Sequence, residues 1–239
     1  MTQRVIMVLG MHRSGTSALI GCLEECGVQL GHVNRESRDT PKGWCEDPTI
    51  TLMHEDLLHC NGGTWSAPPR SVLWTYPHRL IQKTIIESHS KHDVWGFKDP
   101  RTLLTFQGWE DTLPEVEPIV IIRDPVRVAA SLRRRNAMPI EAGLQLWYAY
   151  NRRALAIISE KKCPVLTFGY ACASFVEQVC RLSTYMKFPH QRKEFQHYVR
   201  SQEPESASPE AVVPGAIVEL YQELLSFHKD TMEALSRCS

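Results

Sequence analysis

Short apolar runs and longer stretches with helical periodicity alternate along this chain. The run Arg4–Leu9 (RVIMVL) is rich in β-branched residues and ends at Gly10, as expected of a buried strand. From Thr16 the apolar residues recur at helical spacing as far as Gly27, which favours the end of a helix. The chain therefore opens with a predicted strand, a glycine-bearing loop and a helix.

The same alternation continues through the rest of the chain. Further strands are predicted at Val94–Lys98, Pro118–Arg123 and Pro164–Phe168. Helices are predicted from residue 48 past 58, and over 77–89, 125–135, 139–160 and 217–235. Strands that alternate with helices predict an α/β protein, with a central parallel sheet flanked by helices in three layers. Ligands of such proteins bind at the carboxyl ends of the strands.

The length of 239 residues favours a single domain, residues 1–239, over two well-formed ones. Residues 201–214 are rich in Ser, Glu and Pro, which predicts a mobile link before the last helix. Lys plus Arg and Asp plus Glu each number 27, so no overall field attracts the chain to nucleic acid or to a membrane. Any anion that it binds must be held by local geometry.

The sequence gives no sign of secretion, membrane insertion or metal binding. The N-terminus lacks the longer apolar region and the cleavage site of a secretory signal, and no run approaches the ~18 apolar residues of a membrane span. Eight Cys in a chain of this length are no disulfide framework, and Cys22 and Cys26 share an apolar helix face where buried free thiols are expected. With no CxxC motif and scattered His residues, we expect a cytoplasmic protein without metal.

The segment Gly10–Ser17 (GMHRSGTS) joins the first strand to the first helix. Gly10 and Gly15, five residues apart, allow backbone N–H groups to turn inward at a helix N-terminus, so the loop is suited to a phosphate. Nucleotide triphosphatases require Lys directly after the second glycine, where this chain has Thr16. The long cation of this loop is Arg13 instead. The alternative is an ordinary strand-to-helix turn that happens to contain an Arg.

A second motif follows the strand predicted at 118–123. Arg123-Asp124-Pro125 ends that strand and caps the next helix, and Ser131 comes eight residues after Arg123. The guanidinium and the hydroxyl are then able to reach one anion. The alternative is a capped connection with a surface Arg.

With these two motifs in view, the sequence resembles the sulfotransferases that use 3′-phosphoadenosine 5′-phosphosulfate (PAPS). Their 5′-phosphosulfate loop reads like the segment Arg13-Ser14-Gly15-Thr16-Ser17, and their 3′-phosphate element is an Arg with a Ser eight residues later, as Arg123 and Ser131 are here. The segment Lys98-Asp99-Pro100-Arg101 is similar to the KDP segment of tyrosylprotein and small bacterial sulfotransferases. The resemblance covers residues 4–160 and implies a P-loop-type fold.

The resemblance implies a role for each matched residue. Ser14–Ser17 and Arg13 would bind the 5′-phosphosulfate, and Arg123 and Ser131 the 3′-phosphate. Sulfuryl transfer is similar to phosphoryl transfer, with a loose in-line transition state. Arg13 would stabilise the leaving oxygen, and Lys98 would act beside it; the alternative for Lys98 is a surface salt bridge with Asp99. The product is adenosine 3′,5′-bisphosphate (PAP), and no metal is required.

A general base must take the proton of the acceptor. The leading candidate is Glu46 in Gly43–Asp47 (GWCED), a segment similar to one in small bacterial members; the alternative is an ordinary carboxylate at a helix start. Glu36 and His54 are competing candidates, although His54 lies near an apolar helix face and favours a core position. The indole side chains that would line an acceptor pocket, or equally the core, are Trp44, Trp65 and Trp74.

Two other classes remain open at this stage. A P-loop kinase or nucleotide hydrolase would explain the glycine loop, but it explains neither Thr16 in the lysine position nor the pair Arg123 and Ser131. A non-catalytic nucleotide-binding module has no need for Arg13, Lys98 and a nearby Glu together. The acceptor would be a small molecule, a glycan or a lipid that carries a hydroxyl or an amine. Its identity depends on the loops around the site and not on the fold.

Overall fold

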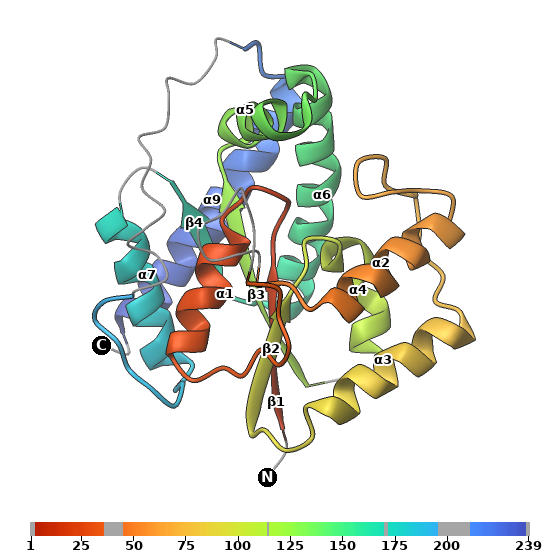
Figure 1. Ribbon diagram of the computed structural model, residues 1–239. Helices are drawn as coiled ribbons and strands as arrows, with labels where there is room; N and C mark the ends of the chain where they lie inside the picture. The colour runs from red at the N-terminus through yellow and green to blue at the C-terminus, as the bar shows by residue number, and fades with distance from the viewer. Residues whose placement is uncertain (1–2, 36–44, 114, 170–171, 196–210, 238–239) are drawn as a thin grey trace.

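The computed structural model describes residues 3–35, 45–113, 115–169, 172–195 and 211–237 of this chain (Figure 1). Four strands within these residues form one parallel sheet in the order β2-β1-β3-β4: β1 (Arg4–Leu9), β2 (Val94–Lys98), β3 (Val116–Arg123) and β4 (Val165–Phe168). The helices are α1 (Thr16–Glu25), α2 (Pro48–Cys60), α3 (Tyr76–Ser88), α4 (Thr102–Glu110), α5 (Pro125–Asn136), α6 (Ile140–Lys161), α7 (Cys172–Tyr185) and α9 (Gly215–Ser236). The predicted α/β fold with a parallel sheet flanked by helices is confirmed.

Helices cover both faces of this sheet because its strands are apolar on both sides. Val5, Met7 and Leu9 of β1 belong to a core shared with α2, α4, α5, α6 and the start of α9. Ile6 and Val8, which point the other way, pack with α1 and α7. In Figure 1, α1 and α7 lie on one side of the sheet, and α2, α4 and α6 lie on the other.

The register brings the carboxyl ends of the strands to one edge. Val8 pairs with Lys98 at the end of β2, and Arg123 pairs with Phe168 at the end of β4. The loop after β1, the segment after β2 and the turn into α5 therefore begin side by side. This edge is the place where the sequence predicts a ligand.

Two helices are absent from the sequence expectations. α4 is buried on almost all sides, from Thr102 and Leu103 to Trp109, so it has no polar face to reveal a helical period. α7 does have a periodic signal in Phe175, Val179 and Leu182, all buried against α1 and the sheet. Most of the predicted link, residues 201–210, lies outside the described residues.

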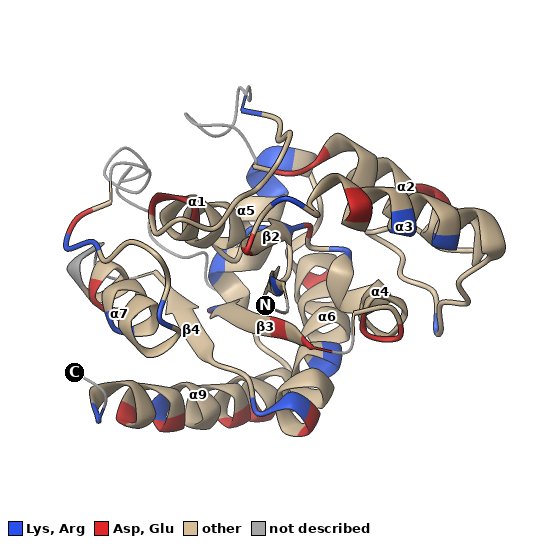
Figure 2. Ribbon diagram, turned by 90° about the horizontal axis from the view of Figure 1, so that it is seen from below, with Lys and Arg blue, Asp and Glu red and all other residues tan. Residues whose placement is uncertain are grey.

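The helices differ in the charges that they carry. Lys or Arg lies near Asp or Glu along α9 (Figure 2), whereas the charged side chains are all acidic on α2 and all basic on α5. Among the described residues, no helix combines the length and the apolar character that a membrane crossing requires.

Candidate active site

The loop between β1 and α1 is shaped by two glycines. A Cβ at Gly10 would lie 2.7 Å from the carbonyl oxygen of Ile121, and one at Gly15, where φ is +90°, would lie 2.3 Å from Cγ of Phe168. Gly15 is the N-cap of α1 and offers no side-chain cap, and the first turn of this helix contains no acidic residue. The N-terminal N–H groups and the helix dipole are therefore suited to an anion.

Arg13 joins this loop to the second motif. Its Nε donates a hydrogen bond to Oγ of Ser131 at 2.8 Å, and its carbonyl oxygen accepts one from Nη1 of Arg123 at 2.9 Å. The guanidinium of Arg123 lies over the ring of Phe168, 5.3 Å from its centroid. Two motifs that are 110 residues apart in the sequence thus adjoin.

Lys98 faces inward from the end of β2. Its side chain is 1% exposed, and its Nζ lies 2.7 Å from Oε1 of Glu46, whose side chain is 15% exposed. The alternative of a surface salt bridge between Lys98 and Asp99 is therefore wrong. Asp99 is fully buried and instead accepts hydrogen bonds from the backbone N–H of Arg101 at 2.7 Å and from Thr51 Oγ1 at 3.1 Å.

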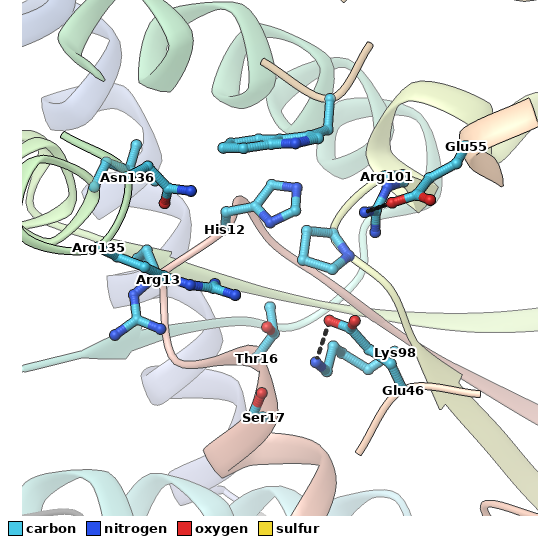
Figure 3. A pocket seen from close by; sticks show the side chains of 13 residues that line it. His12, Arg13, Thr16, Ser17, Glu46, Glu55, Lys98, Arg101, Arg135 and Asn136 are labelled. Atoms are coloured by element: carbon cyan, nitrogen blue, oxygen red, sulfur yellow. Dashed lines mark hydrogen bonds and ion pairs between the residues drawn. The ribbon is translucent and has the colours of Figure 1, made fainter. Parts of the chain in front are cut away.

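A pocket of about 270 Å³ lies at the N-terminus of α1 (Figure 3). Arg13 enters it from one side, Lys98 and Glu46 come from the opposite side, and Thr16 and Ser17 lie below. The other lining residues are His12, Glu55, Trp65, Pro100, Arg101, Leu132, Arg135 and Asn136. Five of the predicted site residues therefore meet in one pocket.

Four predicted residues are not among those that line this pocket. Gly15 is the N-cap of α1, and Ser14, Arg123 and Ser131 are buried, with exposed fractions of 1%, 7% and 2%. Arg123 and Ser131 are connected to the pocket because both form hydrogen bonds with Arg13, which lines it.

The pocket also contains charged residues that sequence reasoning missed. Arg101 lies between two carboxylates: its Nη1 is 3.2 Å from Asp99, and its Nη2 is 2.5 Å from Glu55 of α2. Arg135 and Asn136 come from the end of α5. Arg101 could have been found because it directly follows the KDP segment, whereas Glu55 enters only through the packing of α2.

Burial and neighbouring charges shift the pKa of His12 in the pocket and of the buried Asp99. Burial, followed by the charges of Arg101 and Lys98, lowers the pKa of His12 to about 3, so this imidazole is neutral near pH 7. Burial would raise the pKa of Asp99, but interaction with His54, whose Nδ1 is 3.7 Å away, and the charge of Arg101 hold that pKa well below its usual range. The His12 ring also packs against Trp65, with centroids 4.6 Å apart.

The competing candidates for the base lie elsewhere. His54 is fully buried, its Nε2 accepts a hydrogen bond from Trp109 Nε1 at 2.8 Å, and it does not line the pocket. Glu36 and Trp44 are outside the described residues. Trp65 lines the pocket, whereas Trp74 packs on Trp109 with centroids 5.9 Å apart.

Fold and pocket together define an α/β protein with a cationic pocket at the carboxyl edge of its sheet. No protein-family model matches the sequence, and no curated protein matches it. Among solved structures, the chain is similar to the sulfotransferase domain from the curacin biosynthetic pathway, with a TM-score of 0.54 and 13% identity over 94% of this chain and 98% of that one. This likeness shows that the chain has a sulfotransferase fold.

Two further solved structures are less similar. A sulfotransferase from Alicyclobacillus acidocaldarius has a TM-score of 0.49 at 13% identity, covering 99% of this chain and 96% of that one. Retinol dehydratase in complex with androsterone and inactive cofactor PAP has a TM-score of 0.38 at 12% identity, covering 97% and 82%. With TM-scores below 0.5, neither adds to the conclusion about the fold.

Proposed function

We propose that this chain is a sulfotransferase that moves a sulfuryl group from PAPS to an acceptor hydroxyl or amine by in-line displacement. The observation that carries the proposal is the convergence of Arg13, Lys98 and Glu46 on one pocket at the N-terminus of α1. They come from three separate segments of the chain. A simple phosphate cradle would need the helix N-terminus but not two cations facing a carboxylate.

The donor substrate would lie with its 5′-phosphosulfate on the loop residues Ser14–Ser17. Arg13 would donate to the leaving oxygen, where negative charge accumulates in a loose transition state. The buried ammonium of Lys98 would neutralise the same developing charge. Arg123 and Ser131, which adjoin Arg13, would bind the 3′-phosphate by charge-assisted hydrogen bonds. This binding mode uses protein groups alone and needs no metal.

Glu46 would take the proton of the acceptor. Its carboxylate borders the pocket and forms an ion pair with Lys98, which would hold it toward the acceptor. The acceptor would approach past His12 and Trp65. It would be a small molecule, a glycan or a lipid that presents a hydroxyl or an amine.

Calorimetry with PAP, ATP and 5′-AMP tests the nucleotide. We expect binding of PAP and much weaker binding of the other two, because only PAP carries the 3′-phosphate that Arg123 and Ser131 would bind. Binding of ATP in preference to PAP would instead favour the P-loop kinase class. Turnover of labelled PAPS in an acceptor screen then distinguishes an enzyme from a binding module.

Arg123→Ala tests the 3′-phosphate site directly. Loss of a desolvated charge-assisted contact should weaken PAP binding by about 2–5 kcal/mol, and Ser131→Ala should weaken it by less. Arg134→Ala, which removes an exposed Arg from α5, the helix that follows Arg123 in the chain, is the matched control. Equal affinity of Arg123→Ala and the wild type would remove this residue from the site.

A further inference from the structure

Three side chains with different donor atoms meet where α2 ends and α3 begins. Asp56 and Cys60 are one turn apart on α2, and His78 lies in the first turn of α3. One ligand atom from each lies within 4.8 Å of the other two. The Oδ2 atom of Asp56 is 3.0 Å from His78 Nε2 and 3.8 Å from Cys60 Sγ. None of the three lines the pocket described above.

The imidazole of His78 is held in a fixed orientation. Its side chain is 4% exposed, whereas that of Asp56 is 68% exposed and Cys60 is exposed as well. On the far side of the ring, His78 Nδ1 lies 2.6 Å from Oγ1 of Thr75, the residue before α3. Metal-binding His residues typically have such an outer partner on the second nitrogen, which fixes the ring and its tautomer.

We propose that Asp56, Cys60 and His78 form a binding site for Zn²⁺. Thiolate, imidazole and carboxylate are the donors that zinc takes in proteins, whereas Mg²⁺ and Ca²⁺ prefer oxygen alone. Zinc bonds of about 2.0–2.3 Å place tetrahedral ligand atoms about 3.3–3.7 Å apart. Two of the three separations, 3.0 and 3.8 Å, lie close to that range, and the third pair of ligand atoms lies within 4.8 Å, so side-chain adjustments would bring the three atoms to that geometry. A water molecule would take the fourth position.

Zinc binding at this site would release one proton. For a neutral His78, the ionised carboxylate of Asp56 can only accept, so Nε2–H would donate to it and Nδ1 would accept from the hydroxyl of Thr75. On binding, the ring adopts the other tautomer and donates Nδ1–H to Thr75 Oγ1, which accepts once its hydroxyl rotates. The thiol of Cys60 loses its proton because the thiolate is the metal ligand. One proton is therefore released for each Zn²⁺ bound, and no oxidant is involved.

The site would fasten α3 to α2. The two helices are joined by residues 61–75, which form no helix or strand, and α3 lies at the periphery of the molecule (Figure 1). A metal that binds the folded chain stabilises it by mass action. The inference is independent of the sulfotransferase proposal, and it departs from the sequence expectation of a chain without metal.

Zinc titration of the tag-free full chain against a chromogenic chelator tests the site. We expect one tight equivalent in the wild type. Cys60→Ala and Asp56→Asn, both at exposed side chains, should weaken that equivalent by about 100-fold or more, since even the loss of an outer-shell partner costs about 10–100-fold. Thr75→Val, which removes the outer partner of His78, should weaken zinc binding by about 10–100-fold. Cys180→Ala, which removes a half-buried thiol from α7, is the matched control and should retain the wild-type affinity.

Two further measurements complete the test. Calorimetry in buffers of different ionisation enthalpy should report about one proton released per Zn²⁺ in the wild type. Zinc should also raise the Tm of the wild type and of Cys180→Ala, but not that of Cys60→Ala. If Cys60→Ala and Asp56→Asn bind zinc as tightly as the wild type, or if no tight equivalent is found, the site does not exist.

Discussion

Arg13 adopts the left-handed backbone conformation, with φ of 69°, in the loop that leads into α1. This conformation costs a non-glycine residue about 1–3 kcal/mol and persists only where the surroundings hold it. Here Ser131 accepts a hydrogen bond from the Arg13 side chain, and Arg123 donates one to its carbonyl oxygen. The residue is therefore held through both its side chain and its backbone, which would suit the role that we propose for this cation.

The first prediction concerns this cation. Arg13→Ala should lower turnover by about 10²–10³, the scale for losing one preorganised donor to a developing oxyanion. Affinity for PAPS should fall much less, since under the proposal the N-terminus of α1 and Arg123 would still bind the two phosphate ends. Arg13→Lys should recover part of the loss, because it restores the charge but not the planar fork. Single-turnover rates at saturating PAPS measure the effect. Unchanged rates would mean that the loop only binds phosphate.

Glu46 gives a second prediction at the same scale. Glu46→Gln should lower turnover by about 10²–10⁴, as expected for loss of a general base, while calorimetry should find PAP affinity nearly unchanged. Glu87→Gln, at an exposed carboxylate of α3, serves as the control. A mutant that retains most of its activity would transfer the role to Glu36, because His54 is enclosed in the core.

At the scale of elements, the segment after β2 connects three parts of the molecule. Lys98 binds Glu46, which lies just before α2. Asp99 and Arg101 bind each other, and through Thr51 and Glu55 they attach α2 to the sheet. The position of α2, and with it one wall of the pocket, therefore depends on this buried charge network.

Asp99→Asn should reveal that dependence. Breaking a buried ion pair from one side costs about 3–5 kcal/mol of stability, because the remaining charge is left without its full partner. Urea denaturation should therefore find Asp99→Asn much less stable than Asp111→Asn, whose ion pair with Arg79 is exposed and worth about 0–1 kcal/mol. Equal stability of the two variants would contradict a supporting role for Asp99.

The strands and most helices were predictable from the sequence, but α4 was not, and α7 was missed although its buried residues are periodic. The strands and the amphipathic helices α5 and α6 lie within a few residues of their predicted bounds. The sequence did not predict α4, because nearly all of its residues are buried and no polar stripe marks a helical period. The sequence also did not predict that His78 lies close to Asp56 and Cys60, because this proximity depends on how α3 packs on α2.

At the scale of the whole molecule, parallel topology explains why part of the candidate site was predictable. Arg13, Lys98 and Arg123 follow, or stand at the end of, three strands, and a parallel sheet brings those ends to one edge. Glu46 and Ser131 were found through motif spacing. Glu55, Arg135 and Asn136 reach the pocket through the angles at which α2 and α5 pack, and a linear pattern carries no information on those angles.

The global stability of the chain should depend on pH through His12. The pKa of this imidazole is lowered from 6.5 to about 3 in the folded state by burial and by the charges of Arg101 and Lys98. Between these two pH values the unfolded chain binds a proton that the folded chain does not. The contribution of His12 to the free energy of unfolding is therefore fully present above pH 6.5 and is lost as the pH falls toward 3. The slope from this group is at most about 1.4 kcal/mol per pH unit.

Urea denaturation at pH 7, 6, 5 and 4 measures this effect. Carboxylates such as Asp99 also lose stabilising interactions in acid, so the wild type must be compared with His12→Asn, whose side chain cannot titrate. We expect the difference in unfolding free energy between the two proteins to shift in favour of His12→Asn as the pH falls. The exposed His32 provides the control, because His32→Asn removes an imidazole that folding leaves in water. A His12→Asn difference that stays constant from pH 7 to 4 would mean that His12 accepts its proton in the folded pocket, which would then contain one more cation for an anionic substrate.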